Sequence, residues 1–175
     1  MITVVLSGAE STGKTTLSRD LARAFGTVAT PEYARLYLDA KGLPLTVHDV
    51  EPIARGQMAL EDDAVHGARR LLFKDTDLVS TVVYARHYYG ACPGWIEDAA
   101  RQRAGDLYLL LYPDVAWVAD GPHRDRPQAR EEIHGLFRVV LGELGVTFID
   151  VRGSWAERQA LAKEAVDALL QSATG

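Results

Sequence analysis

Eight residues near the start of the chain, Gly8-Ala9-Glu10-Ser11-Thr12-Gly13-Lys14-Thr15, have the types and spacing of a phosphate-binding loop. Glycines let the backbone curl so that successive N–H groups converge on an anion, and the start of a following helix adds its positive dipole end. Lys14 can reach the β- and γ-phosphates of a nucleotide, and the Thr15 hydroxyl can bind Mg²⁺. The motif therefore predicts a nucleotide-phosphate site.

Charged residues follow the predicted strands at the edge where parallel sheets bind ligands. Asp75 closes an apolar strand and is the candidate acid for holding Mg²⁺; the alternative is that Asp75-Thr76-Asp77 only caps a helix or turn. Glu32, followed by Arg35 after the second strand, is the predicted general base; the alternative is an acid that stabilises a helix N-terminus. Asp77 is the rival for either role.

A third candidate segment, residues 121–130, combines glycine, proline and arginine between a strand region and a long helix. Phosphoryl transfer needs positive charge over the migrating group, and a mobile lid carrying Arg124 and Arg126 would supply it and exclude water. The alternative is a solvated loop whose arginines pair with nearby acids. Because the segment accompanies a phosphate loop, the lid is the favoured interpretation.

Aromatic side chains also gather in the middle of the chain, where they could stack on a base-like ring, although most such side chains pack in a core. The group consists of Tyr84, His87, Tyr88, Tyr89, Trp95 and Trp117. Neither His87 nor His123 has the spacing of a zinc ligand.

Apolar patterning places these residues on alternating strands and helices. Strands are predicted at residues 2–6, 27–30, 71–75, 107–112 and 146–151, and helices at residues 14–25, 32–42, 46–69, 95–103, 128–145 and 154–170. Residues 76–90 favour a strand by propensity, although tertiary contacts can make such a segment helical. The alternation predicts one α/β domain over residues 1–175, with three layers, a mostly parallel sheet and an arginine-rich lid.

Composition limits the classes of partner. The 19 basic and 24 acidic residues give a formal charge of −5, which argues against a nucleic-acid binder. A single cysteine, Cys92, forms no internal disulfide and fits a reducing cytoplasm. No apolar run reaches the length of a membrane span, and the first one is too short for a signal peptide. We expect a cytoplasmic protein with a small-molecule substrate; nothing in the pattern indicates its oligomeric state.

Together, and in this order, these motifs resemble the ribosylnicotinamide kinase domain of the NadR family of bacterial NAD-salvage proteins. The resemblance covers about residues 1–160. It is carried by the phosphate loop, Glu32-Tyr33-Ala34-Arg35, Asp75-Thr76-Asp77, the segment from Tyr84 to Gly90, residues 112–121 and Arg158.

The resemblance implies transfer of the ATP γ-phosphate to the 5′-hydroxyl of nicotinamide riboside, which gives nicotinamide mononucleotide. The residues it implies for ATP and Mg²⁺ are Gly8, Glu10, Ser11, Thr12, Gly13, Lys14, Thr15 and Thr16, with Asp75 at the metal and Arg158 towards the adenine. Glu32, Asp75 and Asp77 would line the reacting centre. Arg124 and Arg126 would belong to the lid. The riboside would contact Glu32, Arg35, Tyr84, Tyr89, Trp117 and Asp120.

Longer members of that family carry an adenylyltransferase domain, sometimes with a DNA-binding domain, and only the kinase activity is expected of this sequence. Two alternatives stay open at this point. One is a deoxynucleoside or other nucleoside kinase on the same scaffold. The other is a regulatory ATPase, which needs no second substrate pocket and depends on a residue that orients water.

Overall fold

The computed structural model describes residues 1–116, 118 and 128–173. Within these residues, five strands form one sheet in the order β2-β3-β1-β4-β5, and every neighbouring pair is parallel. The strands are β1 (Ile2–Ser7), β2 (Val28–Thr30), β3 (Leu71–Asp75), β4 (Leu107–Leu111) and β5 (Phe148–Val151). The prediction of a mostly parallel sheet is confirmed.

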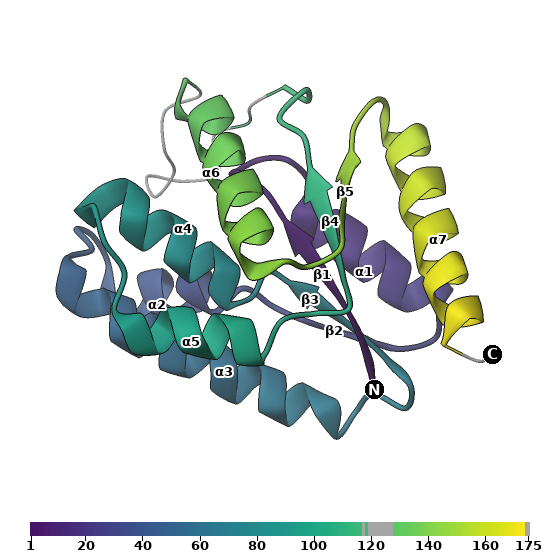
Figure 1. Ribbon diagram of the computed structural model, residues 1–175, viewed down its shortest axis with the longest axis horizontal. Coiled ribbons are helices and arrows are strands. Elements are labelled where there is room, and N and C mark those ends of the chain that lie inside the picture. Colours follow the sequence, from purple (N-terminus) through teal and green to yellow (C-terminus); the bar gives the residue numbers. More distant parts are fainter. Residues whose placement is uncertain (117, 119–127, 174–175) are drawn as a thin grey trace.

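Helices cover both faces of this sheet, so the predicted three layers are present (Figure 1). On one face lie α1 (Lys14–Ala24) and α7 (Trp155–Ser172); on the other lie α3 (Val50–Val65), α4 (Leu78–Tyr89), α5 (Gly94–Gln102) and α6 (Ala129–Leu144). Alternate residues of the central strand enter the two cores, Val5 on one side and Val4 and Leu6 on the other. Among the described residues, no helix is long and apolar enough to cross a membrane.

Strand register brings the loops of the predicted site to one edge. Leu6 of β1 lies opposite Asp75 of β3, and Thr30 of β2 lies opposite Lys74. The carboxyl ends of three neighbouring strands therefore meet where α1, α4 and the short helix α2 (Tyr33–Lys41) begin.

Residues 78–89 form helix α4 rather than the strand that their valines favour. The Asp77 carboxylate accepts the Val79 N–H at 2.9 Å and so begins the helix, and Gly90, at φ 78°, ends it. Both Val79 and Val83 are fully buried between the sheet and the neighbouring helices. Burial therefore outweighs the modest propensity of β-branched residues for strands. The preceding helix α3 also ends at Val65, before the predicted residue 69.

Thr76 is the single residue between the end of β3 and the cap of α4, and it has a left-handed backbone with φ 73°. This conformation is costly for a β-branched residue. Its buried hydroxyl also has no hydrogen-bond partner among the described residues. The tight connection from strand to helix is therefore made at the cost of local strain.

We expect Thr76→Gly to raise the free energy of unfolding by about 1 kcal/mol, because glycine adopts a positive φ without steric penalty. Thermal unfolding should show a melting temperature about 3 °C higher. Thr76→Ala is the matched control, since it also removes the hydroxyl but keeps the Cβ. A glycine variant no more stable than the alanine variant would show that the backbone is not strained.

Candidate active site

The phosphate-binding loop lies between β1 and α1, and its two glycines are required by the close approach of other chain segments. A Cβ on Gly8, whose φ is 136°, would lie 2.7 Å from the main-chain oxygen of Leu111 on β4. A Cβ on Gly13, whose φ is 93°, would lie 2.8 Å from the ring of Trp155. Larger residues at either position would displace the loop from the sheet or from α7.

Polar side chains of the loop fold back on its own carbonyl groups. The Lys14 ammonium donates to the main-chain oxygens of Gly8 and Ala9, both at 2.9 Å, and the Thr12 hydroxyl donates to Ala9 at 2.8 Å. Ser11 donates to the main-chain oxygen of Val118 at 2.8 Å. No described side chain caps the first turn of α1, so its N–H groups face the loop and can bind an anion.

Asp75 lies directly behind this loop. The Thr15 hydroxyl donates to its Oδ2 at 2.5 Å, whereas its buried Oδ1 has no partner within the described part of the chain. A hydroxyl and a carboxylate with an oxygen to spare are hard ligands suited to Mg²⁺, which also keeps water and phosphate oxygens in its shell. Among the described residues, no cluster of three or more His, Cys, Asp or Glu side chains could hold a metal ion without other ligands.

Asp77 differs from Asp75, because both of its carboxylate oxygens already have protein donors. Oδ1 accepts from Val79, and Oδ2 accepts the Tyr108 hydroxyl at 2.6 Å. Burial raises the pKa of Asp77 to about 6, with a further contribution from the negative charge of Glu61. The capping role weighed for this segment therefore belongs to Asp77, which also lies at the floor of the cavity described below.

Glu32 immediately precedes α2 and is half-buried beside the loop. Burial raises its pKa above the ordinary value; the charge of Lys14 acts against this rise, and that of Asp75 adds to it. A carboxylate with a raised pKa is a better proton acceptor than a solvated one, as a general base requires. Arg35 is more exposed and lines the same cavity one turn further along the helix.

A cavity of about 800 Å³ joins the loop to Glu32 and Asp77, and among the described residues acidic side chains dominate its charged lining. The carboxylates are Glu10, Glu32, Asp39, Asp49 and Asp77, and the cations are Lys14 and Arg35. Among these acids, Asp49 accepts from Lys41 at 2.6 Å and from Tyr37 at 2.7 Å. The Lys41 ammonium, together with these hydrogen bonds, holds the pKa of Asp49 well below its usual range.

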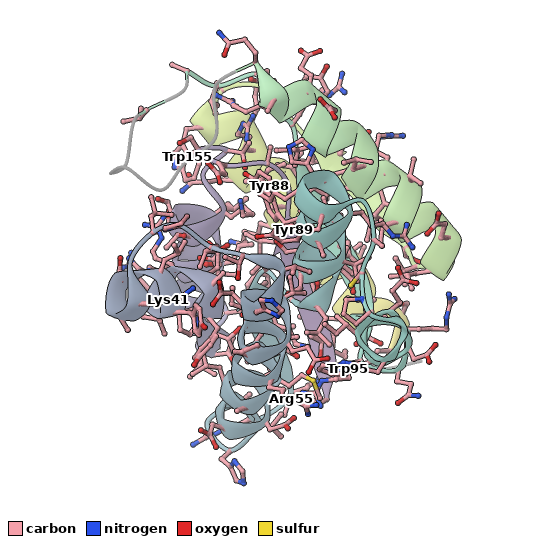
Figure 2. The ribbon with its side chains drawn as sticks, turned by 90° about the vertical axis from the view of Figure 1, so that its left-hand side faces the viewer. Lys41, Arg55, Tyr88, Tyr89, Trp95 and Trp155 are labelled. Carbon is pink, nitrogen blue, oxygen red and sulfur yellow. The ribbon has the colours of Figure 1, made fainter. Side chains whose placement is uncertain are left out.

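Tyrosines of α4 form one side of the cavity. Tyr84, Tyr88 and Tyr89 all line it, and the rings of Tyr84 and Tyr88 stack with centroids 6.0 Å apart. Figure 2 looks onto this side, with Tyr88 and Tyr89 near the middle of the view. Tyr84 and Tyr89, which the sequence analysis expects to contact the substrate, thus both line the cavity, and so does Tyr88.

Two other residues singled out in the sequence, Trp95 and Cys92, do not line this cavity. The guanidinium of Arg55 lies 4.5 Å from the Trp95 ring centroid, and the indole N–H donates to Glu51 at 3.0 Å (Figure 2). Burial raises the pKa of the Cys92 thiol to about 11, so it is protonated at neutral pH. Neither residue has the surroundings of a reactive group.

Arg158 lies behind the phosphate loop rather than on a ligand-accessible surface. Its side chain is fully buried and donates to the main-chain oxygens of Thr12 at 3.1 Å, Tyr112 at 2.8 Å and Gly153 at 2.9 Å. It also pairs with Asp114. This differs from the expected place on the adenine side, because its donors are already used by main-chain carbonyls and a carboxylate. The side chain instead ties the loop to the segments after β4 and β5.

Four predicted site residues fall outside the described part of the chain: Trp117, Asp120, Arg124 and Arg126. Most of the predicted lid, residues 121–127, lies outside it as well. Conversely, the structure adds Thr76, Asp49 and Gln57 to the cavity lining. Asp49 belongs to the capping box of the short helix before α3, and Gln57 has no local motif that marks it.

Comparison with known proteins places these features in a family. The AAA domain family matches residues 3–158. The trifunctional NAD biosynthesis/regulator protein NadR of Escherichia coli K12 is 33% identical over 154 residues, covering 85% of this chain and 38% of that protein. The chain thus spans well under half the length of this curated relative.

Two solved structures of NadR proteins share the fold. One, in complex with NR (nicotinamide riboside), has a TM-score of 0.84 and 27% identity, covering 94% of this chain and 50% of the other. The second, in complex with NAD and AMP-PNP, has a TM-score of 0.76 and 27% identity, covering 94% and 48%.

The buried position of Arg158 predicts a structural effect of its removal. Arg158→Met should lower the free energy of unfolding by about 3 kcal/mol, because three carbonyls and a carboxylate lose their donor. Thermal unfolding should show a melting temperature roughly 8 °C lower. Arg101→Met, on the exposed side of α5, is the control and should unfold close to the unsubstituted protein. An unchanged melting temperature with a raised KM for ATP would instead support direct contact with the nucleotide.

Proposed function

This chain belongs to the AAA domain family and is homologous to NadR over most of its length, and we propose that it is an ATP-dependent kinase of nicotinamide riboside. The product would be nicotinamide mononucleotide, an intermediate of NAD biosynthesis. The single observation that carries the proposal is the cavity that joins a phosphate-binding loop to a half-buried, high-pKa glutamate and a largely acidic wall.

The donor side of this cavity fits ATP. The N–H groups at the start of α1 and the Lys14 ammonium are placed to bind the phosphates, and Thr15 with Asp75 would hold Mg²⁺. When bound, the cation neutralises charge that develops on the phosphate oxygens. Lys14 would exchange its contacts with the loop carbonyls for contacts with phosphate.

The acceptor side fits an alcohol that must be deprotonated as it attacks. Glu32 lines the cavity next to the loop, where its carboxylate would take the proton of the 5′-hydroxyl. Residues that would bind the remainder of the riboside include Arg35, Tyr84 and Tyr89. Asp77 is less suited to be the base, because both of its oxygens already accept hydrogen bonds from the protein.

Charge favours a cationic acceptor over a neutral nucleoside. Nicotinamide riboside carries a fixed positive charge on its pyridinium ring. In the described part of the chain, five carboxylates and two cations line the cavity; one carboxylate, Asp49, is paired with Lys41, and one cation, Lys14, would bind the phosphates. Tyrosine faces also attract cationic rings. A deoxynucleoside would not gain from either interaction, and a regulatory ATPase would have no use for such a pocket.

The proposed reaction would take place in the cytoplasm, where the free thiol of Cys92 stays reduced. The substrates would be small molecules.

A coupled ATP-consumption assay against a panel of nucleosides tests this function. Nicotinamide riboside should stimulate turnover most. Its reduced dihydropyridine form, which keeps the ribose but loses the ring charge, should have kcat/KM lower by about tenfold, since an attraction of about 1.4 kcal/mol is lost. Lys14→Ala, which removes phosphate-directed charge, is the inactive control. Hydrolysis that no nucleoside stimulates would overturn the proposal, and preference for a deoxynucleoside would replace the substrate.

Replacement of the proposed base makes a second prediction. Glu32→Gln should lower kcat by about 10²-fold or more, because an amide cannot accept the proton. The raised pKa keeps Glu32 protonated to a higher pH than an ordinary glutamate. Activity of the unsubstituted enzyme should therefore be lost as the pH falls through that raised pKa, and the variant should lack this limb. If Glu32→Gln has a near-normal rate and still loses activity as the pH falls through about 6, Asp77 would be the general base instead.

A further inference from the structure

Helix α2 begins directly after Glu32, and its first turn has no cap and no buried side chain of its own to fix its position. None of its residues is buried, and the Glu32 side chain does not cap its first turn. A short helix without a buried face gains little stability from packing, so contacts from neighbouring elements must fix its start.

Gln57 of α3 supplies such a contact. Its side-chain oxygen accepts the Tyr33 N–H at 2.9 Å, and its own exposed fraction is 2%. This N–H belongs to the first residue of α2 and has no acceptor within the helix itself. The contact therefore fixes the residue that directly follows Glu32, whose carboxylate caps no N–H of α2 and lines the cavity.

Gly56, the residue before Gln57, makes a second contact with Tyr33. The ring of Tyr33 packs against Gly56 so closely that a Cβ at this position would overlap it. Two successive residues of α3 thus receive the main chain and the side chain of the same α2 residue, which fixes both the position and the rotation of its first turn.

The other end of the Gln57 amide extends the network into the sheet. Its NH₂ group donates to Glu61 at 3.2 Å, and Glu61 accepts from Lys74 of β3 at 2.7 Å. All three side chains are buried, and Lys74 immediately precedes Asp75. An N–H on one side and a carboxylate on the other match the two ends of an amide, so no charged or apolar side chain can replace it.

We propose that Gln57, together with the close packing of Gly56 against Tyr33, is a positioning residue that holds Glu32 in line with the acceptor hydroxyl. Through Gln57, Glu61 and Lys74, the first turn of α2 is connected to β3, the strand that carries Asp75. The proposed base and the proposed metal ligand therefore keep a fixed separation. This inference rests on the proposed role of Glu32.

Gln57→Met tests it, because methionine keeps the length and helix propensity but cannot bind Tyr33 or Glu61. We expect kcat to fall about tenfold or more, since a displaced base is poorly aligned, while KM for ATP changes less than about twofold. Amide hydrogen exchange at Tyr33 should accelerate. Gln159→Met is the matched control: Gln159 also donates to a carboxylate, at 2.9 Å from Asp20, but lies on α7 away from the cavity.

A double-mutant cycle separates positioning from a general structural effect. If Gln57 acts only through Glu32, then Gln57→Met should cause no further loss of kcat in the Glu32→Gln background. An equal loss in both backgrounds, or unchanged kcat with unchanged exchange at Tyr33, would overturn the inference. If Gln57→Met fails to fold, Gly56→Ala takes its place, because its Cβ would displace the Tyr33 ring and leave the hydrogen bond between Gln57 and Glu61 intact; kcat should again fall in the unsubstituted background and not in the Glu32→Gln background.

The two proposals fail in distinguishable ways. Failure of the proposed function appears in the unsubstituted protein, as turnover that no nucleoside stimulates. Failure of the positioning role appears only in the variants, while the unsubstituted protein retains nucleoside-stimulated turnover.

Discussion

The parallel pairing of β1 with β3 and β4 is the constraint on which the site depends. Its register sets Leu6 opposite Asp75, so the start of the phosphate loop and the end of β3 lie side by side, and Thr15 reaches the Asp75 carboxylate. The other edge of β1 pairs with β4, and Gly8, just after β1, passes so close to Leu111 that no side chain fits. The loop is therefore shaped by the sheet beneath it, and its geometry follows from strand register rather than from contacts within the loop alone.

Burial of acidic side chains that line the cavity affects both the stability of the fold and the proposed chemistry. Glu32 and Asp77 both have raised pKa values because burial disfavours their ionised forms. For Asp77, whose pKa rises to about 6, the unfolded chain loses its proton at lower pH than the folded chain does. The folded state therefore loses stability as the pH rises from about 4 to about 6, and ionised Asp77 opposes folding above that range. A cationic ligand in the cavity would offset part of this cost.

Local signals in the sequence were sufficient to locate the loop between β1 and α1 and the acid that lies behind it. The spacing of Gly8, Gly13, Lys14 and Thr15 defines the phosphate loop in any context that offers a strand before it and a helix after it, and an acid that closes an apolar strand identifies Asp75. Long-range contacts could not be predicted from such local patterns. Arg158 is separated from Thr12 by 146 positions, and only the fold shows that it is buried. The sequence left residues 76–90 open between strand and helix, because burial on several sides, rather than local propensity, decides the conformation of α4.

The two halves of the cavity are held by different forces, and this difference bears on specificity. The donor side is built on paired strands and on glycines that tolerate no side chain. The acceptor side is built from α2, which buries none of its residues, and from the tyrosines of α4. Its arrangement depends on polar contacts such as those of Gln57 with Tyr33 and Glu61. Polar contacts between helices can be rearranged by one or two substitutions, whereas strand register cannot. An acceptor preference can therefore change while phosphate binding is retained, and the proposed preference for a charged ring depends on the particular acids and tyrosines that line the cavity.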